Sequence, residues 1–146
     1  MANRNVTVNQ NQNVVINRNR VSFSQAVNLH RHEFHDRDFW RRHFRIVIIN
    51  NNAFFFDAGF WFPAWGYFPG AYYPYDGPIY GYNDLPPDQV VVNAQVQLQR
   101  DGYYSGPIDG VLGPTTRHAL AAFQADHGLA VTAAIDEATA STLGLS

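Results

Sequence analysis

The chain has 146 residues, enough for one ordinary domain or for a small domain with a tail. It contains no cysteine, which excludes a disulfide framework and catalysis by a thiolate. All ten basic residues are arginine, and eight of them fall in residues 1–45 beside three acids, whereas residues 46–146 carry two arginines and nine acids.

Residues 1–29 are a low-complexity segment rich in asparagine. Valine and isoleucine alternate loosely with asparagine, but asparagine is poor in strands, so we predict a disordered segment or a weak edge strand. The basic charge of residues 1–45 predicts either an arm that contacts an anionic polymer or a solvated, loosely ordered arm. We favour the solvated arm and expect no nucleic-acid partner. Residues 1–20 show no secretory signal. The sequence contains no run of 18 apolar residues, so we expect no transmembrane segment.

Residues 30–45 read HRHEFHDRDFWRRHFR and hold four of the six histidines. Histidines with nearby Glu and Asp can bind a divalent metal, although the spacing is not HExxH. The alternative, which we favour, is a mixed-charge helix whose Asp and Arg form weak surface pairs. We therefore assign no metal ligands and no cofactor. The histidines are His30, His32, His35 and His43.

A short strand and an aromatic-rich segment follow. Phe44–Ile49 is β-branched and apolar, Asn50–Asn52 suit a turn, and residues 53–56 can return as a hairpin partner. Residues 54–82 combine many aromatic rings with prolines and glycines that interrupt regular structure. Their rings either form a glycan-contacting platform or hold an irregular segment onto the rest of the protein, and the second interpretation is simpler.

Three helices are expected in the last third of the chain. Two prolines stiffen a linker at residues 84–89, and Asp88 is the expected cap of a helix that runs to about Asp101. A glycine-rich and proline-rich loop leads to a second helix, which begins at Pro114 and ends near Gly128. The third is expected from about Asp136 to Leu143.

The loop and second helix, GYYSGPIDGVLGPTTRHALAAFQADHGL at residues 102–129, carry the most specific pattern. Together with Gln95, Leu98, Ile135-Asp136, Thr139 and Leu143-Gly144, this stretch resembles the bacterial peptidoglycan-binding-like domain family at residues 90–145. Two positions depart from the family pattern. Ala133 stands where glycine is usual, and Asp101 where an apolar residue is usual.

The resemblance implies a small bundle of three helices that binds the bacterial cell wall. The expected fold class is therefore a mainly α C-terminal domain, a three-helix bundle, preceded by an irregular, partly β or disordered N-terminal region. The expected divisions are a low-complexity segment, a His/Arg-rich then aromatic-rich region, a linker and the helical domain. These correspond to residues 1–29, 30–83, 84–89 and 90–146.

Candidate contact residues are exposed side chains near the loop. Tyr103 and Tyr104 offer aromatic faces to sugars, although packing onto the helices is an equal alternative. Arg117 can pair with a stem-peptide carboxylate, and His118 lies beside it in the sequence. Gln124 is expected to hold a backbone turn rather than to contact glycan.

The expected function is non-enzymatic binding of peptidoglycan, through its glycan or stem peptide, by a module that anchors its N-terminal region in the envelope. No convincing catalytic set is present. An envelope function implies a periplasmic or secreted location, which conflicts with the lack of a visible signal in residues 1–20. A start assigned too far downstream, a removed leader or an intracellular role would each resolve this conflict. The alternative is a structural or interaction protein in which the helical domain is a scaffold and the Asn-rich and aromatic region binds partners or itself.

Overall fold

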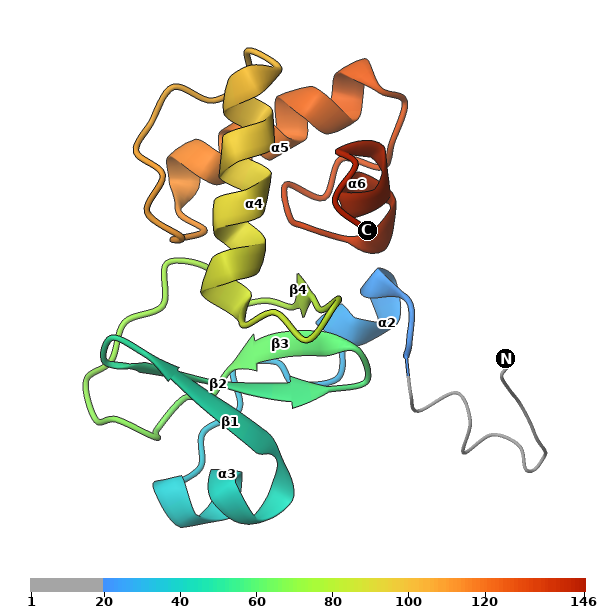
Figure 1. The fold of residues 1–146 in the computed structure, drawn as a ribbon. Coiled ribbons are helices and arrows are strands. Elements are labelled where there is room, and N and C mark those ends of the chain that lie inside the picture. Colours follow the sequence, from blue (N-terminus) through green and yellow to red (C-terminus); the bar gives the residue numbers. More distant parts are fainter. Residues whose placement is uncertain (1–19) are drawn as a thin grey trace, which may run out of the picture.

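A computed structural model describes residues 20–146, and the predictions for residues 1–19 lie outside this part of the chain. The described chain combines a small β-sheet with three helices that follow it (Figure 1). The expected fold class was wrong for the N-terminal part, because residues 45–80 form a four-stranded antiparallel sheet rather than an irregular region. The protein is therefore a mixed α and β fold.

The sheet is a meander of strands in the order β1-β2-β3-β4. Two-residue turns join the first three strands, and Ala58 and Gly59 both have positive φ, 52° and 91°. That conformation matches the twist of a tight hairpin. The predicted strand at Phe44–Ile49 and its hairpin are confirmed. The strands are β1 (Arg45–Ile49), β2 (Asn52–Asp57), β3 (Phe60–Pro63) and β4 (Ile79–Tyr80).

Two short helices precede the sheet. α2 (Phe23–Val27) begins with a capping box between Ser22 and Gln25, so part of the segment expected to be disordered is helical. α3 (Arg37–His43) is capped by Asp36, whose side chain accepts a hydrogen bond from the amide of Phe39.

Buried aromatic rings join α3 to the sheet. Trp40 is fully buried and stacks on Phe55, with ring centres 4.5 Å apart. Phe55 stacks in turn on Phe62 of the neighbouring strand. Most aromatic residues of the 54–82 segment are buried in the same way, which confirms the packing interpretation for them. The buried members include Phe60, Trp61, Tyr67, Tyr73, Tyr80 and Tyr82.

The three C-terminal helices are α4 (Pro87–Arg100), α5 (Pro114–Asp126) and α6 (Glu137–Thr142). Pro114 opens α5 and Asp136 caps α6, as predicted. The cap predicted for α4 was wrong, because the helix starts at Pro87 and the cap position is Pro86, which leaves Asp88 inside the first turn. No described helix is long and apolar enough to cross a membrane.

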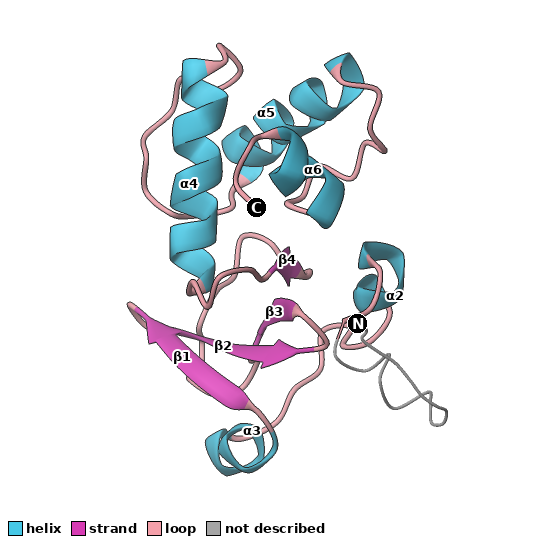
Figure 2. Ribbon diagram, turned by 45° about the vertical axis from the view of Figure 1, so that its right-hand side comes forward, coloured by secondary structure: helices cyan, strands magenta, loops and turns pink. Residues whose placement is uncertain are grey.

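The sheet and the helices share one continuous hydrophobic core. β4 lies between β3 and the three helices (Figure 2). The amide of Tyr80 donates to the carbonyl of Ile135, 3.0 Å away, and the Trp61 indole donates to the carbonyl of Leu85. These contacts position residues of the sheet region beside the N-terminal ends of α4 and α6.

Candidate functional site

A groove of about 400 Å³ lies where the N-terminal region meets the helices. We call it the Arg117 groove. Among the described residues, Arg117 is the one arginine that the three C-terminal helices contribute to its lining. Its wall on the N-terminal side comes from α2, the loop after it, and the segment before β4. The lining residues are Phe23, Val27, His30, Arg31, His32, Phe62, Tyr75, Asp76, Gly77, Pro78, Arg117 and Thr132.

Arg117 projects from the first turn of α5 and is half-buried. Its Nε donates to the carbonyl of Ala133, 2.9 Å away, and its guanidinium lies 4.9 Å from the centre of the Tyr75 ring. Within residues 20–146, no carboxylate forms an ion pair with Arg117. A guanidinium carries five N–H donors, so this contact set leaves donors for a carboxylate ligand.

The opposite wall of the groove holds a second polar cluster. Asp76 accepts a hydrogen bond from the Trp65 indole at 2.7 Å and pairs with His32 Nδ1 at 2.6 Å. These bonds hold the Trp65 and His32 rings in place, with centres 4.3 Å apart. Phe34 packs beside both rings and is 57% exposed, so an aromatic surface adjoins the groove.

The predicted contact residues do not form one site. Tyr103 donates to Asp126 at 2.8 Å and packs edge-on to Phe123, near the far end of α5. Asp126 lies nine positions after Arg117 on α5, which corresponds to about 13 Å along the helix axis. Tyr103 is therefore distant from the Arg117 groove.

Tyr104 and His118 also lie outside the groove lining. Tyr104 is 6% exposed, and its hydroxyl donates to the carbonyl of Pro107, so it offers no aromatic face to a ligand. His118 is exposed and follows Arg117 in the sequence, but it does not line the groove. A ligand contacts it only if the ligand extends beyond the groove.

Two buried glutamines shape the loops between the helices. Gln95 Oε1 accepts hydrogen bonds from the amides of Asp109 and Gly110, and Gln124 Oε1 accepts from those of Thr132 and Ala133. The predicted structural role of Gln124 is thus confirmed. The equivalent role of Gln95 was missed, although an amide side chain on an otherwise apolar helix face is a sequence signal for it.

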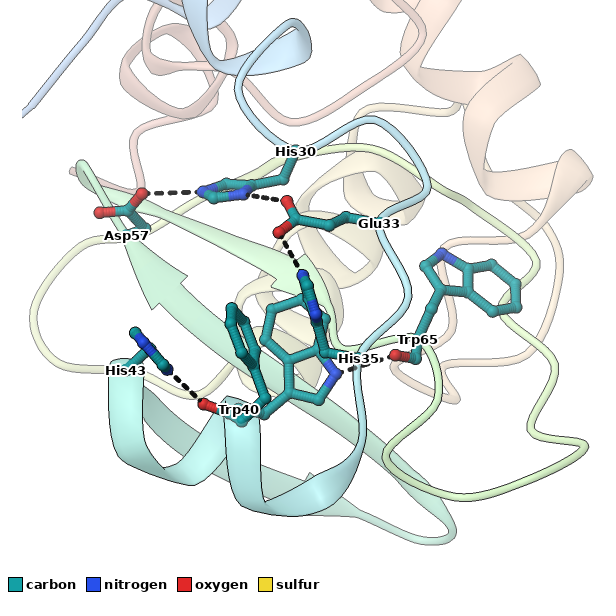
Figure 3. Close-up of polar contacts among 8 residues, drawn as sticks. His30, Glu33, His35, Trp40, His43, Asp57 and Trp65 are labelled. Atoms are coloured by element: carbon teal, nitrogen blue, oxygen red, sulfur yellow. Dashed lines mark hydrogen bonds and ion pairs between the residues drawn. The ribbon is translucent and has the colours of Figure 1, made fainter.

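In the histidine-rich segment, His30 and His35 form hydrogen-bonded pairs with carboxylates, whereas His43 bonds to the carbonyl of Phe39 (Figure 3). His30 lies between two of them, with Nδ1 2.9 Å from Glu33 and Nε2 2.8 Å from Asp57. His35 Nε2 binds the other oxygen of Glu33 at 2.7 Å. Burial alone raises the pKa of Glu33, but the hydrogen bonds from His30 and His35 outweigh it and lower the pKa.

Both ring nitrogens of His30 face carboxylate oxygens, which only accept hydrogen bonds, so both bonds form together when the ring carries two protons. A ring in that state has no lone pair for a metal. Within residues 20–146, no three His, Asp or Glu side chains converge as metal ligands. The contacts of this cluster instead tie the loop after α2 to the end of β2.

Comparison with known proteins identifies the helical part. Residues 87–143 match the family model described as "Putative peptidoglycan binding domain", which confirms the resemblance seen in the sequence. A stretch of 52 residues is 46% identical to the "Localization factor PodJL" of two strains of Caulobacter vibrioides, NA1000 / CB15N and CB 15. That stretch is 36% of this chain and 5% of each relative.

Proposed function

We propose that this chain is a non-enzymatic module that binds bacterial peptidoglycan through the Arg117 groove. The observation that carries the proposal is an arginine without an ion-pair partner among the described residues, positioned over a groove at the edge of the family-matched helices. Peptidoglycan combines sugar rings with stem peptides that end in carboxylates. The groove offers a guanidinium for the carboxylate, and its rim offers aromatic faces for a sugar.

The contact residues proposed from the sequence are revised accordingly. Arg117 binds the stem-peptide carboxylate, and His118 contributes from the rim. Tyr104 is omitted because it is buried, and Tyr103 is omitted because it lies toward the other end of α5. The N-terminal region supplies one wall of the groove, so it takes part in binding as well as being anchored by it. This function places the protein in the cell envelope.

The test is co-sedimentation of the full chain with purified sacculi. Wild type should be retained, and Arg117→Ala should lose at least about ten-fold in apparent affinity, because a charge-assisted hydrogen bond contributes roughly 1.5–3 kcal/mol. Arg100→Ala is the matched control and should bind as wild type does, since Arg100 is exposed at the C-terminal end of α4 and does not line the groove. Absence of wild-type retention would sink the proposal.

A second candidate function is that of a scaffold or interaction protein, favoured by the match to a protein named as a localization factor. In that case the helices support an association surface elsewhere in the chain. Light scattering over a range of protein concentrations separates the two proposals. A constant monomeric mass counts against self-association, whereas a mass that rises with concentration, together with no retention on sacculi, favours the scaffold.

A further inference from the structure

A second cavity, of about 270 Å³, shares one lining residue, Tyr75, with the Arg117 groove. We call it the Asp88 cavity. One wall is the β1–β2 turn with Phe54 and Tyr73, and the other is the first turn of α4 with residues 110–112. Its size is slightly below the range of about 300–1,000 Å³ typical of small-molecule sites, which suits a single sugar residue.

The glycine at position 110 keeps the two sides of the helical wall close together. Gly110 has φ 74°, and a Cβ atom there would lie 3.2 Å from the carbonyl oxygen of Asp88 and 3.3 Å from a methyl group of Val92. Its amide is fixed by Gln95. The loop therefore holds Val111 and Leu112 against the start of α4, where they form part of the cavity lining.

The polar side chains that line the cavity are a carboxylate and asparagine amides, and none of them is positively charged. Asp88 Oδ1 is a buried side-chain oxygen that has no hydrogen-bond partner among the described residues. The carboxylate torsion of Asp is soft, so rotation can present either oxygen to a ligand. Asn50 and Asn51, which are exposed on the turn, add amide groups at the mouth. No arginine or histidine is among the lining residues of this cavity.

The remaining surface is apolar. Tyr73 contributes its ring alone, because its hydroxyl donates to the Ala53 carbonyl and accepts from the Ala53 amide. Phe54 packs edge-on to that ring, with centres 5.4 Å apart. Val91 and Leu112 are buried on the facing wall. A ligand here needs an apolar portion beside a hydrogen-bond donor.

We propose that the Asp88 cavity binds a neutral, N-acetylated amino sugar. Its acetamido N–H donates to Asp88, its methyl group contacts the apolar wall, and its hydroxyls reach the amides of the turn. An anionic ligand is disfavoured, because it would meet a carboxylate and no cation. This inference rests on the proposed function and divides the polymer between two sites, with the sugar in the Asp88 cavity and the stem-peptide carboxylate at Arg117.

The experiment is calorimetric titration of the full chain with the β-1,4-linked tetramer of N-acetylglucosamine. Cellotetraose, which lacks the acetamido groups, is the matched ligand, and free N-acetylglucosamine distinguishes a monosaccharide site from one that needs a glycan chain. The acetylated tetramer should bind at least about ten-fold more tightly than cellotetraose, the effect of one hydrogen bond to a charged group. Equal affinity for the two tetramers, or no binding of either, would overturn the proposal.

Two variants at exposed valines locate the site. Val111 lines the cavity and is 43% exposed, so Val111→Trp should fill the cavity and abolish tetramer binding. Val131 is 59% exposed and does not line the cavity, so Val131→Trp should bind as wild type does. Asp88→Asn should weaken binding about ten-fold or more. Wild-type affinity in Val111→Trp, with its fold verified by circular dichroism, would contradict the assignment.

The sacculus assay separates this inference from the proposed function. Retention on sacculi that depends on Arg117, without tetramer binding, overturns the Asp88 cavity alone. Tetramer binding that is lost in Val111→Trp, without retention on sacculi, supports the cavity and overturns the proposed function. If the protein neither is retained on sacculi nor binds the tetramer, both proposals are overturned.

Discussion

The guanidinium of Arg117 lies 4.9 Å from the centre of the Tyr75 ring, which joins α5 to the segment that precedes β4. Burial raises the pKa of the Tyr75 hydroxyl, which donates to the carbonyl of Pro78. Tyr75 also lines both the Arg117 groove and the Asp88 cavity. One aromatic residue of the N-terminal region therefore orients the arginine on which the proposed function depends.

Arg117 should also contribute to stability, and this effect has to be separated from binding. Arg117→Ala removes a cation–π contact and a hydrogen bond to Ala133, which together are worth about 1–2 kcal/mol. We expect denaturant unfolding to show a loss of that size. Arg117→Lys keeps the charge but not the planar fork, and should lie between wild type and Arg117→Ala. A variant as stable as wild type would show that the contact with Tyr75 is energetically silent.

Of two glutamines on α4, the buried Gln95 should be more critical to stability than the exposed Gln89. Gln95→Leu leaves the amides of Asp109 and Gly110 without their acceptor, and we expect a loss of roughly 2–5 kcal/mol in unfolding free energy. Gln89→Leu is the control, since Gln89 is exposed and, within residues 20–146, its side chain hydrogen-bonds only to Asn93. Chemical denaturation measures both. A cost below about 1 kcal/mol for Gln95→Leu would contradict the loop-holding role.

Ala133→Gly should stabilise the protein. Ala133 has φ 55°, a left-handed conformation that costs a residue with a Cβ atom roughly 1–2 kcal/mol and costs glycine nothing. Its backbone bonds to Gln124 and Arg117 do not involve the side chain. We expect a gain of about 1 kcal/mol, reduced by the extra chain entropy of glycine. A lower melting temperature in a thermal scan would refute this.

Asp109 should make stability depend on pH in the acid range. Burial alone raises its pKa, but hydrogen bonds from Gln95 and the Val111 amide outweigh this and lower the pKa. A carboxyl whose pKa is lowered in the fold stabilises it above the ordinary pKa of about 3.9, and that contribution is lost as pH falls through the folded-state value. The destabilisation caused by Asp109→Asn should therefore be full near neutral pH and shrink in acid. The test is to measure the unfolding free energies of wild type and Asp109→Asn against pH. A difference between the two that stays unchanged down to strong acid would contradict this prediction.

Local signals in the sequence were sufficient to predict the three C-terminal helices and the first hairpin. The glycine and proline positions predicted α5, and the β-branched run predicted β1. β3 and β4 were missed because Phe60–Pro63 and Ile79–Tyr80 are short and lie among prolines, and their strand character comes from pairing with neighbours. α2 was missed although Ser22 and Gln25 form a capping box, because the helix has only five residues.

The candidate site was predictable only in part. Arg117 was a candidate because it was expected to be exposed near the loop, but Tyr75, whose ring it contacts, lies 42 positions away in a segment without regular periodicity. Packing was an equal alternative for both tyrosines, but the sequence could not show which of the two is buried, because Tyr103 and Tyr104 are adjacent and chemically identical. Only the fold places one ring against the surface of α5 and the other beneath the loop.

The most direct test of the central claim is an NMR titration of the full ¹⁵N-labelled chain with a soluble disaccharide–peptide fragment of peptidoglycan. We predict that saturable shift changes include the amides of Tyr75 and Asp76 and the Arg117 side-chain Nε–H. Those changes should be absent at Tyr103 and Asp126, which lie toward the other end of α5. Changes centred on Tyr103, or no changes at all, would contradict binding in the Arg117 groove.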